Sequence, residues 1–184
     1  MLVQRSALAA WVLLLAPALH AATPANGTLS VANPELTYSS GVYVVPAAGG
    51  CTAQTPCDDY ALTVELPADY LTTNPADKLR ISADMGNPAS DYDLALLSST
   101  GAELASSGNN PGETEVIEVP VSSGMNTYTV RLTPFAPAGA AASVTITLVR
   151  SAAPPPPPAG ENPGPVYSGP VPRYQIYVPP SPFG

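Results

Sequence analysis

The sequence predicts an all-β protein, an antiparallel β-sandwich or jelly roll followed by an extended, proline-rich C-terminal tail. Three observations lead to this fold class. Apolar and polar side chains alternate repeatedly within residues 36–150, turn-forming residues separate the alternating segments, and 12 of the 24 prolines lie after residue 150. Many short strands without convincing helical periodicity are typical of sandwiches and closed β-structures.

The first 22 residues read as a secretory signal peptide. Arg5 provides a basic start, residues 7–18 are apolar, and Ala21 and Ala22 are small enough for cleavage nearby. The apolar run is too short to span a bilayer, and no later stretch approaches the ~20 apolar residues that a spanning helix needs. We therefore expect an exported protein, secreted outside the cell or held in the periplasm, without a membrane span.

Residues 23–35 are small and polar and include Pro24, Gly27 and Pro34, so we expect a flexible leader there. The sandwich is then predicted over residues 36–150. Its length of about 115 residues suits one domain with one core.

The alternation gives seven or more predicted strands. Regular alternation covers four segments: 60–66, 79–85, 128–133 and 144–148. Less regular apolar runs add three more: 42–45, 94–97 and 116–121. Residues 66–78 have room for a helical turn, which Pro67 and Pro75 limit. Tyrosines and β-branched residues dominate the expected core, and Phe135 is its only phenylalanine.

Cys51 and Cys57 are the only cysteines and enclose five residues. In an oxidising compartment, a close pair is most simply a disulfide. Two alternatives fit less well, because a metal site would need more sulfur or nitrogen ligands and a redox motif would need C-x-x-C spacing.

Residues 151–172 predict a stiff linker, because the five consecutive prolines 154–158 favour an extended polyproline helix. Residues 173–184 begin with a strand-like alternation, Arg173 to Val178. We expect them to be either the start of a downstream domain or a disordered tail.

The charge and residue inventory excludes several function classes. A net charge of −8 repels phosphate backbones, so nucleic-acid binding is not expected. The only histidine, His20, lies in the predicted signal peptide, and Lys78 is the only lysine. Catalysis that uses a histidine base is therefore excluded from the exported chain, and no catalytic residue is predicted.

Calcium is the one metal that the sequence suggests, and no other cofactor is expected. Asp84, Asp91 and Asp93 lie around the loop 86–90, and Asp91 and Asp93 would share one face of a strand. The alternative is that Asp93 caps a turn by accepting backbone hydrogen bonds.

A sugar-binding face is a further candidate, since tyrosines can stack on carbohydrate rings. The candidates are Tyr38, Tyr43, Tyr60, Tyr70, Tyr92 and Tyr128. The strand spacing of Tyr60 and Tyr128 favours the core for these two. The expected partner is an extracellular glycan or a protein matrix, and the protein is expected to be a monomer.

Residues 41–149 resemble the bacterial pre-peptidase C-terminal domain, a jelly-roll sandwich appended to secreted hydrolases. The residues that match are Cys57–Val64, Leu79–Ser82, Asp91–Leu96 and Ser98–Ser107, the last as a strand, a turn containing glycine and another strand. Some relatives, such as the collagen-binding modules of secreted collagenases, bind calcium, but their ligand pattern does not map cleanly onto this sequence.

The tail Pro172–Tyr177 is similar to the segment that leads into a sialidase-like repeat (BNR) propeller in comparable secreted proteins, and no propeller follows in this sequence. The resemblance therefore implies a non-catalytic accessory module, tethered by a proline-rich spacer to a propeller or hydrolase domain. The alternative is a complete small secreted adhesin or carbohydrate- or matrix-binding protein.

Overall fold

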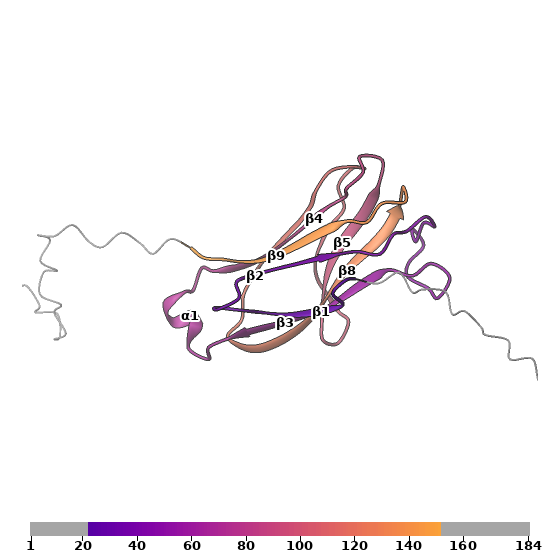
Figure 1. Ribbon diagram of the computed structural model, residues 1–184. Helices are drawn as coiled ribbons and strands as arrows, with labels where there is room; N and C mark the ends of the chain where they lie inside the picture. The colour runs from indigo at the N-terminus through magenta and orange to yellow at the C-terminus, as the bar shows by residue number, and fades with distance from the viewer. Residues whose placement is uncertain (1–21, 152–184) are drawn as a thin grey trace, which may run out of the picture. The chain divides into compact units, whose positions relative to one another are not determined.

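Nine strands within residues 22–151, the part of the chain that this computed structural model describes, form two sheets that face each other (Figure 1). The predicted β-sandwich is therefore confirmed. The predictions of a signal peptide, a proline-rich linker at 151–172 and a further segment at 173–184 fall outside the described residues, apart from Ala22 and Ser151.

The larger sheet has five strands, and only its β1–β3 pair is parallel. In spatial order these strands are β1 (Asn26–Ser30), β3 (Asp58–Leu66), β8 (Gly124–Ala136), β5 (Asp91–Ser98) and β6 (Glu103–Ser107). The smaller sheet is antiparallel throughout. Its order is β2 (Glu35–Ser39), β9 (Ser143–Val149), β4 (Lys78–Asp84) and β7 (Glu115–Pro120).

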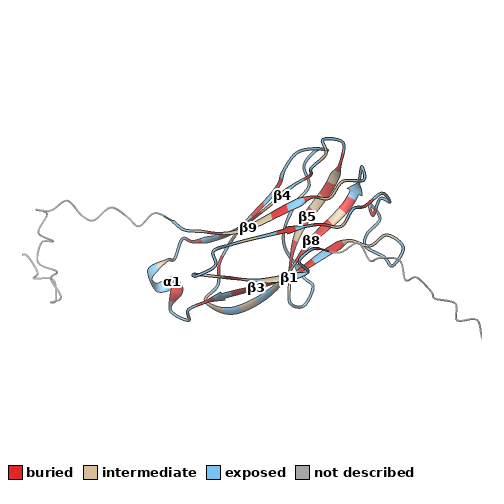
Figure 2. Cartoon of the chain, viewed as in Figure 1, coloured by how far each residue is buried: buried red, intermediate tan, exposed pale blue. Residues whose placement is uncertain are grey.

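The core lies between the sheets and follows the predicted alternation (Figure 2). Along β3 every second residue, from Asp58 to Leu66, is buried, because successive side chains of a strand point to opposite faces. From the other sheet, Ile81 and Ile146 are fully buried and paired side by side. The predicted helical turn is also present, as α1 (Tyr70–Thr73).

The predicted flexible leader at 23–35 is wrong, because this segment belongs to the sandwich. β1 lies within it, and Leu29 of β1 is fully buried. Before β1, Thr23 exchanges two backbone hydrogen bonds with Ser39 of β2, at 2.8 and 3.0 Å. The small and polar composition of residues 23–35 gave no sign of a strand. β1 nevertheless pairs with β3 and buries its one large apolar side chain, Leu29.

The predicted strand at 42–45 is also wrong, because this segment is a loop. Its valines Val42, Val44 and Val45 are exposed, and only Tyr43 between them is buried. Single backbone bonds hold the loop, from Gly139 N–H to the Tyr43 carbonyl and from Ala47 N–H to the Pro134 carbonyl. Consecutive valines favour an extended backbone, but here no continuous ladder forms on either side.

Phe135 was expected in the core and is instead 45% exposed. The inward positions at this end of β8 are Val130, Leu132 and Pro134. Phe135 falls at the opposite phase of the two-residue repeat, so its ring points outward.

The predicted disulfide is present, since Cys51 and Cys57 are bonded. The turn that it closes is also held by hydrogen bonds between Thr52 and Thr55, including Thr52 N–H to the Thr55 carbonyl at 2.9 Å. The bond joins an exposed loop to Cys57, the residue immediately before β3.

Replacing both cysteines by serine is expected to lower the free energy of unfolding by about 2 kcal/mol, because a short closed loop removes only limited entropy from the unfolded chain. Urea unfolding of wild type and C51S/C57S measures this. The Thr52–Thr55 bonds should keep the turn intact, so the fold should survive. Loss of the sandwich in the double variant would contradict this.

Candidate functional site

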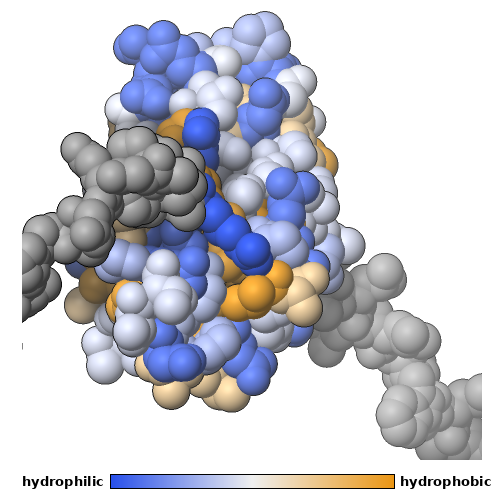
Figure 3. All heavy atoms as spheres, turned by 90° about the vertical axis from the view of Figure 1, so that its left-hand side faces the viewer, coloured by the Kyte–Doolittle hydropathy of each residue, from blue (hydrophilic) through white to orange (hydrophobic). Residues whose placement is uncertain are grey.

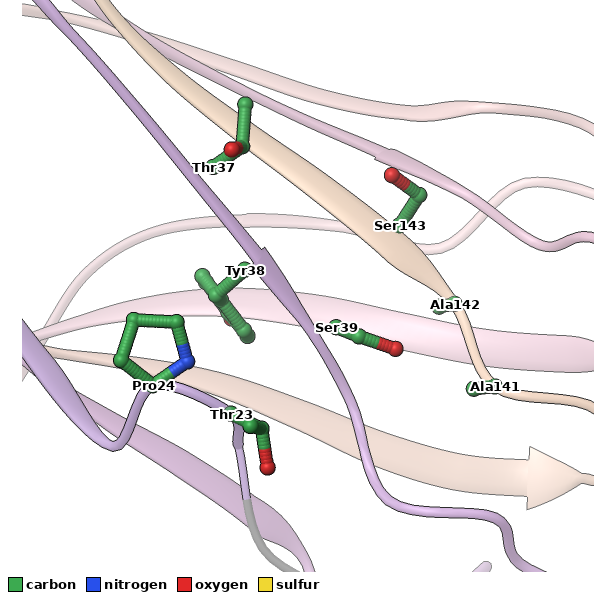
Figure 4. A pocket seen from close by; sticks show the side chains of 8 residues that line it. All are labelled: Thr23, Pro24, Thr37, Tyr38, Ser39, Ala141, Ala142 and Ser143. Carbon is green, nitrogen blue, oxygen red and sulfur yellow. The ribbon is translucent and has the colours of Figure 1, made fainter.

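The surface of residues 22–151 carries shallow open hollows. One, of about 380 Å³, lies beside β2 and is bordered by Pro24, Tyr38 and Ser143 among others (Figure 4). Its other lining residues are small, and Figure 4 shows short hydroxyl and methyl side chains around it. The end of the sandwich that carries α1 mixes hydrophilic and hydrophobic residues, with a small hydrophobic area near its centre (Figure 3).

The three predicted calcium ligands are divided between the two sheets. Asp84 ends β4 in the smaller sheet, is exposed and accepts the Gly86 N–H at 3.0 Å. Asp91 and Asp93 lie on β5 in the larger sheet, at alternate positions and therefore on one face, as predicted. Across residues 22–151, no three acidic, histidine or cysteine side chains come together in a group that could hold a metal ion.

Asp93 has the more distinctive surroundings of the three. It borders a hollow of about 390 Å³ together with Glu103, Ser106 and Thr133. Burial raises the pKa of its carboxyl, and the negative charges of Asp91 and Glu115 raise it further. A cation would relieve this repulsion, so Asp91 and Asp93 remain the residues on which the calcium prediction depends.

Melting temperatures in excess calcium and in chelator test that prediction. A ligand bound to the native state stabilises it by RT ln(1 + [L]/Kd), about 2.7 kcal/mol when calcium is at 100 times its Kd. Calcium binding therefore predicts a higher melting temperature in wild type and no shift in D93N. Equal melting temperatures of the wild type at millimolar calcium and in chelator would remove the prediction.

Sequence reasoning did not place three carboxylates in the core, and the structure shows that they are buried: Asp58, Asp77 and Glu115. A signal for them was present, because each extends the inward phase of an alternating segment. Asp58 precedes Tyr60, Asp77 precedes Leu79, and Glu115 precedes Ile117, all by two residues. A carboxylate at an inward position must be hydrogen-bonded to remain buried.

The buried carboxylates of Asp77 and Glu115 both accept hydrogen bonds. Asp77 accepts the Tyr70 hydroxyl at 2.7 Å and the Ser151 N–H at 2.8 Å. Glu115 accepts the Asn109 N–H at 2.7 Å and the hydroxyl of Ser107. Each acid thus ties a chain segment to the sandwich, Asp77 the end of the described chain and Glu115 the β6–β7 loop.

Asp58 is only partly satisfied. Its Oδ2 accepts the Gly41 N–H at 2.7 Å and the Tyr43 hydroxyl at 3.3 Å. Among residues 22–151, its Oδ1 is buried without a hydrogen-bond partner, and so is the hydroxyl of Tyr38. The neighbouring Asp59 points to the other face, where it is exposed and forms two 2.7 Å bonds with Arg131.

Burial raises the pKa of Asp58, and the charge of Asp59 adds to the rise, while the bonds from Gly41 and Tyr43 oppose it. The pKa of the Tyr43 hydroxyl is raised as well, by burial and then by the charge of Asp58.

The tyrosine platform predicted for sugar binding is not exposed. Five of the six candidates are at most 6% exposed: Tyr38, Tyr43, Tyr60, Tyr70 and Tyr92. Tyr38 and Tyr60 stack on each other with ring centroids 4.2 Å apart, inside the sandwich. Stacking on a sugar needs an accessible ring face, so these tyrosines serve the core; Tyr60 was expected there, and Tyr128 is half-buried.

Comparisons with known proteins give one structural neighbour to report. The sequence matches no protein-family model, and no curated protein matches it. The pre-peptidase C-terminal domain of a collagenase from Bacillus anthracis is similar in structure, with a TM-score of 0.37 and 10% sequence identity. The similarity covers 66% of this chain and 92% of that domain.

The sequence predicts no membrane-spanning helix. Between residues 22 and 151, no helix is long and apolar enough to cross a membrane.

Proposed function

We propose that this chain provides a non-catalytic accessory module of an exported protein, tethered by its proline-rich segment to a downstream domain. The observation that carries the proposal is that two buried acids, Asp77 and Glu115, form structural hydrogen bonds. Asp77 and Glu115 are bonded to backbone amides and hydroxyls that hold chain segments in place. They therefore act as structural anchors.

Two exposed ion pairs support the same proposal. Lys78, the only lysine, forms an exposed ion pair with Glu118 at 3.2 Å, and Asp59 is paired with Arg131. The one histidine, His20, lies in the predicted signal peptide. Acid–base catalysis needs a titratable group placed beside a substrate in a cleft, whereas these charged groups pair across the outer faces of strands.

The hydrogen bonds of Ser151, the last described residue, are consistent with a tether that begins there. Ser151 donates its N–H to buried Asp77 and its hydroxyl to the Ala76 carbonyl at 3.1 Å. The proline run 154–158 starts three residues later. The described chain is therefore anchored at the point where the predicted spacer begins. The disulfide and the predicted signal peptide agree with export to an oxidising compartment.

The intact mass of the polypeptide that the source organism exports tests the tether. We expect a mass well above that of residues 22–184, because the downstream domain, a sialidase-like propeller or a hydrolase, adds to it. A mass equal to that of residues 22–184 would overturn this part of the proposal.

The alternative is a complete small secreted adhesin or a glycan- or matrix-binding protein. The exposed valines Val42, Val44 and Val45 favour a protein matrix over a sugar, since they offer apolar contact and no aromatic ring. Saturable binding to immobilised matrix protein, lost when all three valines become threonine, would support this alternative. Equal binding by wild type and triple variant would remove it.

A further inference from the structure

One buried acid is among the groups that attach the loop between β2 and β3 to the sandwich. Asp58 is 0% exposed, and its Oδ2 is the acceptor for both the Gly41 N–H and the Tyr43 hydroxyl. Residues 41–47, which we name the latch segment, therefore dock on a group that can change its charge. Two backbone bonds, to Gly139 and Pro134, and the packing of the Tyr43 ring against Tyr92 also hold the segment.

The charged form of Asp58 is poorly accommodated. No salt bridge among the described residues includes Asp58, and Oδ1 has no hydrogen-bond partner there. A buried, unpaired charge with an unsatisfied oxygen is costly. A neutral carboxyl avoids this cost, because Oδ2 can still accept from Gly41 while a proton sits on Oδ1.

Within the part of the chain that the structure describes, the groups around Asp58 offer no compensating positive charge. The titratable and charged side chains that surround it are Tyr38 from β2, Tyr43 from the latch segment, Asp59 from β3, Tyr92 from β5 and Arg131 from β8. The tyrosines are neutral, and Asp59 adds negative charge. Arg131 is committed to Asp59 through two bonds on the outer face.

We propose that Asp58 is a proton-operated latch, whose neutral carboxyl holds residues 41–47 closed on the sandwich and whose ionisation lets them open. The closed state binds the proton more tightly than the open state, in which water reaches the carboxyl. Closure is therefore strongest below the ordinary Asp pKa of 3.8. It weakens as the pH rises from there to the higher pKa of the closed state, and is constant above it.

Amide hydrogen exchange of the full chain tests the latch. The reporters are the N–H groups of Gly41, Ala47 and Gly139, which donate to Asp58, Pro134 and Tyr43 respectively. After correction for the intrinsic exchange rate, their protection factors should fall by up to tenfold per pH unit within that window. The amide of Val130, in the middle of the larger sheet, reports global unfolding. Because unfolding also exposes Asp58, the protection of Val130 should follow the same trend but stay above that of the three reporters, which shows that they exchange by local opening.

Two variants give a matched comparison. Asp58→Asn keeps an acceptor for Gly41 and removes the charge, so its three reporter amides should show protection that does not vary with pH. Asp59→Asn removes the adjacent exposed charge and should retain a pH-dependent fall. A wild type with constant protection, or a D59N variant as flat as D58N, would overturn the latch.

A second measurement covers the case in which D58N does not fold. The side-chain carboxyl carbon of Asp58 can be titrated by NMR in the wild type, and we expect its midpoint above 3.8. Tyr43→Phe removes one donor to the carboxylate and should move the midpoint higher still. A wild-type midpoint at or below 3.8 would refute the proposal.

Discussion

Gly112→Ala should cost about 3 kcal/mol of the free energy of unfolding, one of the two largest effects expected from a single substitution here. Gly112 has a φ of 79°, in the left-handed region that L side chains rarely adopt; a non-glycine residue there loses roughly 1–2 kcal/mol. A Cβ at Gly112 would also lie 2.5 Å from the Pro88 carbonyl oxygen and 2.7 Å from its Cα. Backbone cannot yield as a flexible side chain can, so a further 1–3 kcal/mol of overpacking is expected.

Gly124→Ala is the matched control. Gly124 has nearly the same φ, 81°, but no atom lies within 4 Å of a Cβ built there. It should therefore lose only about 1 kcal/mol, the cost of the conformation alone. Urea unfolding of the two variants separates the clash from the backbone strain. Equal losses would contradict close packing of the β6–β7 loop on the loop 86–90.

That contact is one that sequence cannot reveal. Gly112 was visible only as part of a turn signal, Asn-Pro-Gly, between two strands. Its N–H bonds to the Ser90 carbonyl at 2.8 Å, across 22 positions of sequence. Turn chemistry is local and can be predicted, whereas the packing of one loop against another depends on the finished sandwich.

The strands show the same division between local and non-local information. β3, β4 and β9 have strict alternation and strong β-formers, and their positions were predicted to within two residues. β1 was missed because its sequence, Asn-Gly-Thr-Leu-Ser, has one large apolar residue. It is stable only because β3 supplies a parallel partner and a place for Leu29.

The site predictions relied on residue types. They failed where the sequence did not show which sheet a residue belongs to or which way its side chain points. Acidic residues near turns suggested a metal site, but Asp84 lies on a different sheet from Asp91 and Asp93. The tyrosines suggested a binding platform, but most of their side chains face inward. Extending the phase of each strand by two residues would have identified Asp58, Asp77 and Glu115 as buried.

Glu115→Ala should destabilise the sandwich by about 3 kcal/mol. Glu115 is 1% exposed and accepts bonds from the Asn109 N–H and the Ser107 hydroxyl. A hydrogen bond to a charged group contributes about 1.5–3 kcal/mol. Alanine removes both bonds and leaves unfilled space beneath the β6–β7 loop, while water that reaches exposed Asn109 recovers part of the loss. Denaturant unfolding measures the change.

Glu115→Gln separates the hydrogen bonds from the charge. Its amide oxygen can accept from Asn109, and its amino group can donate to the Ser107 oxygen, so stability should fall by less than about 1 kcal/mol. Both variants remove a negative charge that raises the pKa of Asp93. The pKa of Asp93, followed by NMR, should therefore fall in E115Q and E115A alike. A stable E115A, or an unchanged Asp93 pKa in both, would show that Glu115 neither anchors this loop nor acts on its neighbour.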